Sequence, residues 1–290
     1  MNGSPDQEGQ GRTSPGQGAR TPSVHEARTP SDREAHTSPD QEARTSLRSA
    51  CGSTRVSFRA GQWRGRPRAT SVRAESGSPA EASALLLREL PGWLVVTDDS
   101  VAAPLAESGA EVQRRAHRYG WDLSVRPPDP RWAQPALPAP LRLRPAAEIP
   151  ADSLRELWLA AYAAGHPDRA RYERADDGLA TLTSLWRGEL LGPTLPFSAV
   201  AVDDRGPVAV LAVHALERPW ITQIFRDPTP RGRGLGSALL RYALTAAAEY
   251  GLSELGASVT AGNVRSSRMF ESIGFRQLGD SVDLRLPAGP

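Results

Sequence analysis

Between residues 141 and 290 the apolar residues repeat with two periods, one typical of strands and one typical of helices. Residues 141–146 alternate apolar and polar side chains, which predicts a half-buried strand. Leu154, Leu157, Trp158 and Ala161 then recur at helical spacing, so we expect a helix that Pro150 can open. A second helix is expected over 179–186.

The rest of this region predicts three strands, a long helix, and then more strands around a short helix. Strands are expected at 197–202, 208–216 and 221–225, and the first two are joined by a turn-forming sequence, DDRG. Leu235, Leu239, Ala243, Ala246 and Tyr250 share one helical face, and Gly251 follows them as a stop. A strand at 255–259, a helix at 263–273, and strands at 275–278 and 282–286 complete the pattern. It indicates an α/β domain with a mixed sheet over 141–290.

Upstream lies a smaller set of expected elements. Residues 81–125 predict a small α/β unit, with helix, strand, helix and strand near 82–90, 93–97, 100–108 and 111–123. Its sequence LAESGAEVQRR (105–115) faintly echoes FESIGFRQ (270–277), which raises the idea of a degenerate copy of the larger domain. Residues 126–140 are so rich in Pro that we expect a linker.

The first 80 residues are polar and repetitive. Five imperfect repeats such as SPDQEART fill residues 1–45 and contain almost no large apolar side chain, so we expect a disordered tail over 1–80. Residues 46–80 carry seven Arg against one acid, Glu75. Binding of nucleic acid by these arginines is the alternative hypothesis for this segment. Its aromatic residues are limited to Phe58 and Trp63, however, so we expect no nucleic-acid partner.

Composition narrows the class of protein. The chain has 290 residues, a net charge of +2 and 39% hydrophobic residues, with no Lys. Cys51 is the one cysteine and falls in the expected tail, which excludes an internal disulfide and argues against a Cys nucleophile. No signal-peptide or membrane-spanning stretch is visible, so we expect a cytoplasmic protein without a membrane partner.

One glycine-rich segment carries recognisable chemistry. Residues 228–237 read PTPRGRGLGS, between an expected strand and the long helix. Glycines allow close backbone approach, and a helix N-terminus presents free N–H groups, so this arrangement suits a pyrophosphate. Arg231 and Arg233 add positive charge. A strand-to-helix turn without a ligand is the alternative at this point.

Here the chain resembles the GNAT acetyltransferase superfamily. That family places a Pro, an R/Q-x-x-G-x-G/A signature and a long helix after a strand, and this sequence has Pro228, Arg231, Gly234 and Gly236 in that order. Downstream, the family carries an Asn and a closing Gly-Phe, matched here by Asn263 and by 274–275. The resemblance covers about 141–286 and implies a mixed, splayed sheet flanked by helices.

The resemblance also implies where acetyl-CoA binds. Residues of the glycine-rich turn would hold the pyrophosphate through their N–H groups: Arg231, Gly232, Arg233, Gly234, Leu235, Gly236 and Ser237. The pantetheine arm would lie between strands 221–226 and 255–259. An N–H near Phe225 or Arg226 would polarise the thioester carbonyl. Asn263 and Phe270 would complete the cofactor site, and no metal is expected.

Two departures from the family pattern affect the chemistry. Phe270 stands where the family usually has a Tyr that protonates the sulfur, so Ser266, Ser267 or water would have to replace it. Arg226 stands where an apolar residue is commoner.

The general base is not fixed by the sequence. His214 has a suitable intrinsic pKa, and Glu217 and Asp227 lie near opposite ends of the binding strand. His166, in AAGHPDRAR, could face the substrate.

The resulting hypothesis is an acetyl-CoA-dependent N-acetyltransferase. It would move the acetyl group directly to an amine of a small molecule or peptide. The alternative is a non-catalytic acyl-CoA-binding or regulatory module, which Phe270 favours.

Overall fold

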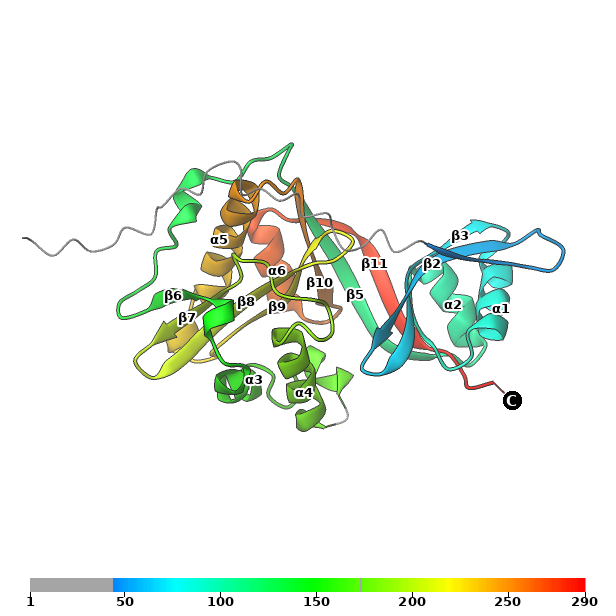
Figure 1. The fold of residues 1–290 in the computed structure, drawn as a ribbon, viewed down its shortest axis with the longest axis horizontal. Helices are drawn as coiled ribbons and strands as arrows, with labels where there is room; N and C mark the ends of the chain where they lie inside the picture. Colours follow the sequence, from blue (N-terminus) through cyan, green and yellow to red (C-terminus); the bar gives the residue numbers. More distant parts are fainter. Residues whose placement is uncertain (1–43, 173, 290) are drawn as a thin grey trace, which may run out of the picture. The chain divides into compact units, whose positions relative to one another are not determined.

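A computed structural model describes residues 44–172 and 174–289. Its centre is one sheet with the strand order β1-β2-β3-β4-β11-β5-β10-β9-β8-β7-β6 (Figure 1). The strands are β1 (Thr45–Arg48), β2 (Arg55–Trp63), β3 (Arg66–Ser76), β4 (Leu94–Thr97), β5 (Glu111–Asp122), β6 (Arg142–Pro145), β7 (Ala199–Asp203), β8 (Gly206–Ala215), β9 (Pro219–Arg226), β10 (Glu254–Thr260) and β11 (Arg276–Arg285). Neighbouring strands are antiparallel except for the pairs β3–β4 and β9–β10.

Helices flank this sheet, which confirms the expected class of a mixed α/β sheet. They are α1 (Pro79–Glu89), α2 (Asp99–Glu107), α3 (Arg155–Ala161), α4 (Ala175–Trp186), α5 (Leu235–Glu249) and α6 (Val264–Ile273). In the described part of the chain, no helix combines the length and apolarity that crossing a bilayer requires.

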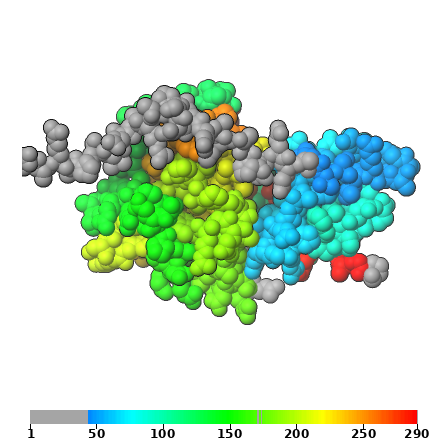
Figure 2. Space-filling model, viewed as in Figure 1, coloured from blue at the N-terminus to red at the C-terminus, as the bar shows by residue number. Residues whose placement is uncertain are grey.

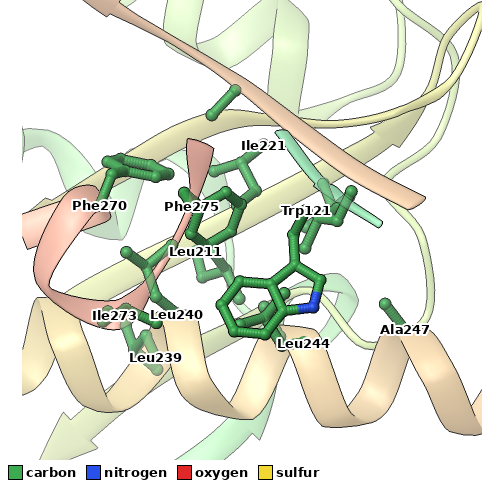
Figure 3. Packing of buried hydrophobic residues seen from close by; sticks show 14 of the residues in the cluster. Trp121, Leu211, Ile221, Leu239, Leu240, Leu244, Ala247, Phe270, Ile273 and Phe275 are labelled. Atoms are coloured by element: carbon green, nitrogen blue, oxygen red, sulfur yellow. The ribbon is translucent and has the colours of Figure 1, made fainter. Parts of the chain in front are cut away.

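Alternation along β8 explains how the sheet is covered on both sides. Leu211 and Val213 belong to the cluster formed with α5 and α6, whereas Val210 belongs to the cluster formed with α3 and α4. Successive side chains of a strand point to opposite faces, so a nearly continuous apolar run is expected for a strand buried on both sides. Figure 3 shows the first cluster, where Trp121 and Phe275 pack over the α5 residues Leu240 and Leu244.

Most of the elements expected after residue 81 are confirmed, with one exception at the C-terminus. The two short strands expected at 275–278 and 282–286 form a single strand, β11. Its register against β5 shifts between Gln277 and Gly279, so the irregularity that suggested a break is accommodated within one strand.

The expectation of disorder is wrong for 44–80. These residues form β1, β2 and β3, while 1–43 lie outside the described residues. Val56 and Phe58 on β2 and Val72 on β3 pack against α1 and α2. The few apolar residues of this Arg-rich stretch therefore fall on one face, and composition alone hid this pattern.

The boundaries expected at 81, 126 and 141 do not separate compact units, because the two halves of the chain exchange strands. The described residues all belong to one compact unit. β5, from the first half, lies between β10 and β11, and β11 in turn lies between β5 and β4 (Figure 1). Each half thus completes the sheet of the other. Residues 126–140 contain no strand, and only a 3₁₀ helix over Pro130–Ala133, as a Pro-rich connection should.

The faint sequence similarity between residues 105–115 and 270–277 falls on corresponding secondary-structure elements. Residues 105–115 run from α2 into β5, and 270–277 run from α6 into β11. The preceding elements also correspond, since β3–α1–β4 and β9–α5–β10 each consist of a parallel strand pair joined through a helix.

Candidate functional site

The parallel strands β9 and β10 separate soon after they meet. They pair at Gly256 with Trp220 and at Ala257 with Ile221, and no further along. Two local features favour this divergence. Gly256 lies against the Trp220 ring, where a Cβ would come within 2.3 Å of a ring carbon. Thr222 is an extra residue in the β8–β9 ladder, and such a bulge bends its strand.

A cavity of about 610 Å³ opens where the strands part. Its wall includes the start of α5 and α6, with Gly234, Gly236 and Phe270. The wall also includes α3 and the segment that follows it, with Tyr162, His166, Asp168 and Tyr172, together with Arg114 of β5.

The start of α5 has the features of an anion cradle. Gly234 caps the helix with a left-handed φ of 78°, so no capping side chain covers the helix end. Ala238 N–H donates to Gly234 O at 3.1 Å. In the described structure the earlier N–H groups of Gly234, Leu235, Gly236 and Ser237 find no protein acceptor, as expected for a first helical turn. They are the groups that could bind a pyrophosphate.

Packing around the turn requires glycine at two further positions. A Cβ on Gly232 would lie 2.1 Å from Asp227 O, and one on Gly236 would lie 2.8 Å from Met269 Sδ. The N–H groups of Gly232 and Arg233 are already used inside the turn, by the carbonyls of Thr229 and Pro230. Two of the N–H groups expected to bind the pyrophosphate, those of Gly232 and Arg233, thus have acceptors within the protein.

The two arginines of the turn have different surroundings. Arg231 donates to both carboxylate oxygens of Asp203, at 2.5 and 2.8 Å, and to Asp227 at 3.3 Å. Its hydrogen bonds lower the pKa of Asp203 to about 2. Arg231 thus fastens the glycine-rich turn to the β7–β8 hairpin rather than facing the cavity. Arg233 is exposed beside Gly234.

Backbone N–H groups of β9 face the cavity at alternate residues. Asp227 N–H donates to Val208 O at 2.8 Å, so in this antiparallel ladder Phe225 N–H also faces β8. The N–H groups of Arg226 and Ile224 consequently point away from β8, on the side where β9 has left β10. Of the two residues named as donors from the sequence, Arg226 therefore directs its N–H towards the split and Phe225 does not, while Ile224 N–H points the same way as that of Arg226.

Phe270 and Asn263 are held in place by structural contacts. Phe270 is buried and stacks on Tyr119, with ring centroids 5.5 Å apart, and also contacts Phe275 (Figure 3). Asn263 caps α6 by accepting from Ser266 N–H, and its amide donates to Asp168 Oδ2 at 3.0 Å. Ser266 lines the cavity.

None of the three residues expected to act as a base lines the cavity. His214 is fully buried between β9 and the end of α4, and burial lowers its pKa. Glu217 accepts from Ser71 and pairs with Arg59 of the first half at 3.4 Å. Asp227 bonds to Thr229 N–H and to Arg231. The geometry therefore gives no direct contact between these groups and a substrate in the cavity.

Other polar residues, most of them not anticipated, do line it. Asp168 accepts from the hydroxyl of Thr260 and from Asn263, and Arg114 Nε donates to Thr260 Oγ1 at 2.8 Å. His166 Nδ1 accepts from Asp168 N–H at 3.2 Å. Of Arg114, His166 and Asp168, only His166 stood out in the sequence, because Arg114 belongs to the other half of the chain and Asp168 to a segment without periodicity. Among the described residues, no group of three His, Cys, Asp or Glu side chains is arranged to hold a metal.

The first half also contacts Tyr172, which lines the cavity. Arg64, in the β2–β3 turn, lies over the ring of Tyr172 at 5.7 Å from its centroid. In Figure 2 the blue residues of these strands border the light-green segment that contains α4. The Arg-rich stretch is thus at least partly engaged with the second half of its own chain.

Comparison with known proteins agrees with this architecture. The model of the Acetyltransferase (GNAT) family matches residues 151–275. A Drosophila protein of solved structure is similar at 17% identity, with a TM-score of 0.55 over 81% of this chain and 75% of that one. A GCN5-related N-acetyltransferase from Sphaerobacter thermophilus has 17% identity and a TM-score of 0.52 over 83% and 80%.

A third solved structure is also similar to this chain. A GCN5-related N-acetyltransferase from Kribbella flavida has 18% identity and a TM-score of 0.51 over 85% of this chain and 90% of that one. Residues 141–290 make up only about half of the chain, so these shares mean that elements of the first half belong to the shared fold as well. No curated protein matches the sequence significantly. The cavity between diverging parallel strands and the family match lead to one conclusion: over residues 151–275, this chain contains a GNAT acetyltransferase domain.

Proposed function

We propose that the protein binds acetyl-CoA and transfers its acetyl group directly to an amine. The observation that carries this proposal is the uncapped start of α5 beside the split between β9 and β10. A run of free N–H groups attracts a pyrophosphate, and the split leaves strand N–H groups open to a ligand that extends from it.

The residues present fit such a ligand. The N–H groups from Gly234 to Ser237 would hold the pyrophosphate, with Arg233 as the nearby cation. Larger side chains at Gly232 or Gly236 would collide with Asp227 or Met269, so glycine at these two positions lets the turn pack closely against the rest of the protein. Acetyl-CoA supplies an activated acyl group as a thioester.

The chain would then stabilise charge that develops on the thioester oxygen. Ile224 N–H and Arg226 N–H face the space where the strands have parted, as fixed donors that need no reorganisation. Phe270 cannot protonate the sulfur. A thiol has an unperturbed pKa of about 8.5, so a thiolate can leave without strong acid assistance.

The acceptor amine would bind beside the segment that follows α3. There the cavity is lined by Tyr162, His166, Asp168 and Tyr172. Its volume and mixed polar and aromatic lining suit a small molecule or the end of a peptide.

The competing proposal is a module that binds acyl-CoA without transferring it. Phe270 in place of an acid favours this reading, as does the absence of the expected bases from the cavity wall. The two functions differ in turnover but share the binding step.

The test uses the full chain, because β5 of the first half completes the sheet next to β10. Calorimetry should detect acetyl-CoA binding, and Gly234→Val should weaken it at least tenfold, since valine disfavours a φ of 78°. The matched control is Gly61→Ala, an exposed glycine of β2 with open space around it, which should bind normally. Release of free thiol over a panel of amines then decides between transfer and binding alone. Absence of binding by the unaltered protein would exclude both proposals.

A further inference from the structure

We propose that Thr222 and His214 form a proton relay that serves acetyl transfer, with Thr222 facing the substrate and His214 behind it. This inference rests on the proposed transferase function. It gives a role to the buried histidine, and it supplies a proton acceptor although none of the three expected bases lines the cavity.

Thr222 lies at the apex of the split. Ile221 is the last β9 residue paired with β10, and Thr222 follows it as the residue of the bulge that has no partner on β8. Thr222 lines the cavity, two residues before Ile224 and its cavity-facing N–H. A hydroxyl is thus placed close to the N–H group expected to polarise the thioester carbonyl.

His214 contacts this hydroxyl from inside the protein. Its Nδ1 lies 2.7 Å from Thr222 Oγ1, and its Nε2 lies 3.3 Å from the carbonyl oxygen of Leu185 at the end of α4. The histidine side chain is fully buried, so solvent does not compete for either nitrogen.

These two partners fix the direction of the hydrogen bonds. A carbonyl oxygen only accepts, so Nε2 of His214 must carry the proton that it donates to Leu185. In the neutral ring Nδ1 is then an acceptor, and Thr222 donates to it. In the opposite tautomer Nε2 would carry no proton and would face the Leu185 carbonyl without a hydrogen bond. The Thr222 hydroxyl also lies 3.3 Å from Ala212 O, which is the longer of its two contacts.

Burial keeps the His214 ring neutral, although it also makes the ring a weaker base. Loss of solvation lowers its pKa, so the ring is neutral around pH 7 and its Nδ1 lone pair is available. A free ammonium ion would not give its proton to so weak a base. The nitrogen of the adduct formed by attack on the thioester is far more acidic, and it is this proton that the relay takes.

The proton balance of the reaction then closes. The neutral amine forms a C–N bond to the thioester carbonyl, and an N–H proton passes to Thr222 Oγ1 while the Thr222 hydroxyl proton passes to His214 Nδ1. The C–S bond breaks with its electron pair on sulfur. The proton returns from His214 through Thr222 to the thiolate, so one N–H bond is exchanged for one S–H bond.

Other candidate bases in the cavity are already engaged. Nδ1 of His166 accepts from Asp168 N–H, which leaves its Nε2 as the protonated nitrogen. The carboxylate of Asp168 accepts from Thr260 and Asn263. Thr222 is distinguished from these groups by its connection to a neutral acceptor nitrogen.

The kinetic test compares Thr222→Val with Thr222→Ser on an amine that the unaltered protein acetylates. Removal of the hydroxyl should lower kcat about 100-fold, in line with the usual contribution of general acid–base groups, with the KM for acetyl-CoA within threefold. Serine keeps the hydroxyl and should restore most of kcat. His214→Gln should resemble the valine variant, and the double variant should be no slower than either single one, since both break the same path.

The control is Thr181→Val, which removes a hydroxyl that bonds within α4 to Asp177 O and should leave kcat unchanged. Equal kcat for Thr222→Val and the unaltered protein would overturn the relay and leave the transferase standing. Failure of the unaltered protein to acetylate any amine would overturn both.

A second measurement does not depend on turnover or on variants that fold poorly. Nitrogen NMR of the His214 ring in the unaltered protein should show a protonated Nε2 and an unprotonated Nδ1 at pH 7. A proton on Nδ1 would overturn the relay whatever the kinetics show.

Discussion

Arg231 and Asp203 form a two-point hydrogen-bonded ion pair, with N–O distances of 2.5 and 2.8 Å, that joins the glycine-rich turn to the β7–β8 hairpin. The family signature places an arginine at this position, and here its guanidinium supports the cradle from behind. The turn is thereby held against the sheet without any ligand.

Replacing Asp203 by Asn should lower the free energy of unfolding by about 2 kcal/mol at pH 7, the usual range for hydrogen bonds to charged groups. The folded pKa of Asp203 lies near 2, below its ordinary 3.8, so the stabilisation is present above about pH 3.8 and is lost as pH falls towards 2. Urea unfolding of both proteins from pH 7 to 2 should show the difference shrinking over that window. Asp204→Asn, at an exposed position of the same turn, is the control and should change little.

The protein should bind one acetyl-CoA per chain, although both halves contain a parallel strand pair joined through a helix. At the start of α1, Ser78 N–H donates to Glu81 Oε2 at 2.7 Å and Glu81 N–H donates to Ser78 Oγ at 3.2 Å. This capping box uses donors that a phosphate would need, and it places a carboxylate there. Calorimetric titration should give a stoichiometry of one. A value of two would show that α1 also forms a cradle.

Glu217→Gln should leave kcat within twofold of the unaltered protein, because Glu217 does not line the cavity. Its contacts are Arg59 and Ser71 in the first half of the chain. The variant should instead lose a little stability, less than about 1 kcal/mol, as expected for a partly exposed ion pair. Steady-state kinetics and thermal unfolding check the two parts. A large fall in kcat would restore Glu217 as a candidate base.

The two halves should unfold together, because they exchange strands. Trp121 on β5 is buried against Phe275 and Trp132 in the core shared with α5. Trp121→Ala should therefore destabilise the whole protein by about 3–5 kcal/mol, in a single transition. Differential scanning calorimetry checks this, and two separate transitions would contradict it. Removal of residues 44–125 should leave β10 and β11 without β5 and prevent folding of the remainder.

Much of the fold could be predicted because it follows from local periodicity and from turn residues. The helical spacing from Leu235 to Tyr250, the stop at Gly251 and the alternation in 141–146 each point to the element that the structure contains. The glycine spacing at 232, 234 and 236 located the turn before α5 for the same reason, since a left-handed φ and close packing demand glycine wherever they occur.

Local sequence patterns gave wrong or no predictions where the structure depends on contacts between residues that are far apart in the sequence. Composition predicted a tail over 44–80, yet these residues form strands because Val56, Phe58 and Val72 meet α1 and α2. Likewise, nothing in the sequence near Arg114 indicates that β5 will lie beside β10 and bring this side chain to the cavity.

The sequence by itself determined most of the secondary structure after residue 81, the family signature and the position of the glycine-rich turn, because these depend on residues a few positions apart. Tertiary structure decided which polar groups meet. It buried His214 against Thr222, tied Glu217 to Arg59 and turned Arg231 away from the cavity. Those pairings join residues from different strands or different halves of the chain, and their proximity is a property of the register and strand order of the sheet rather than of any local run of residues.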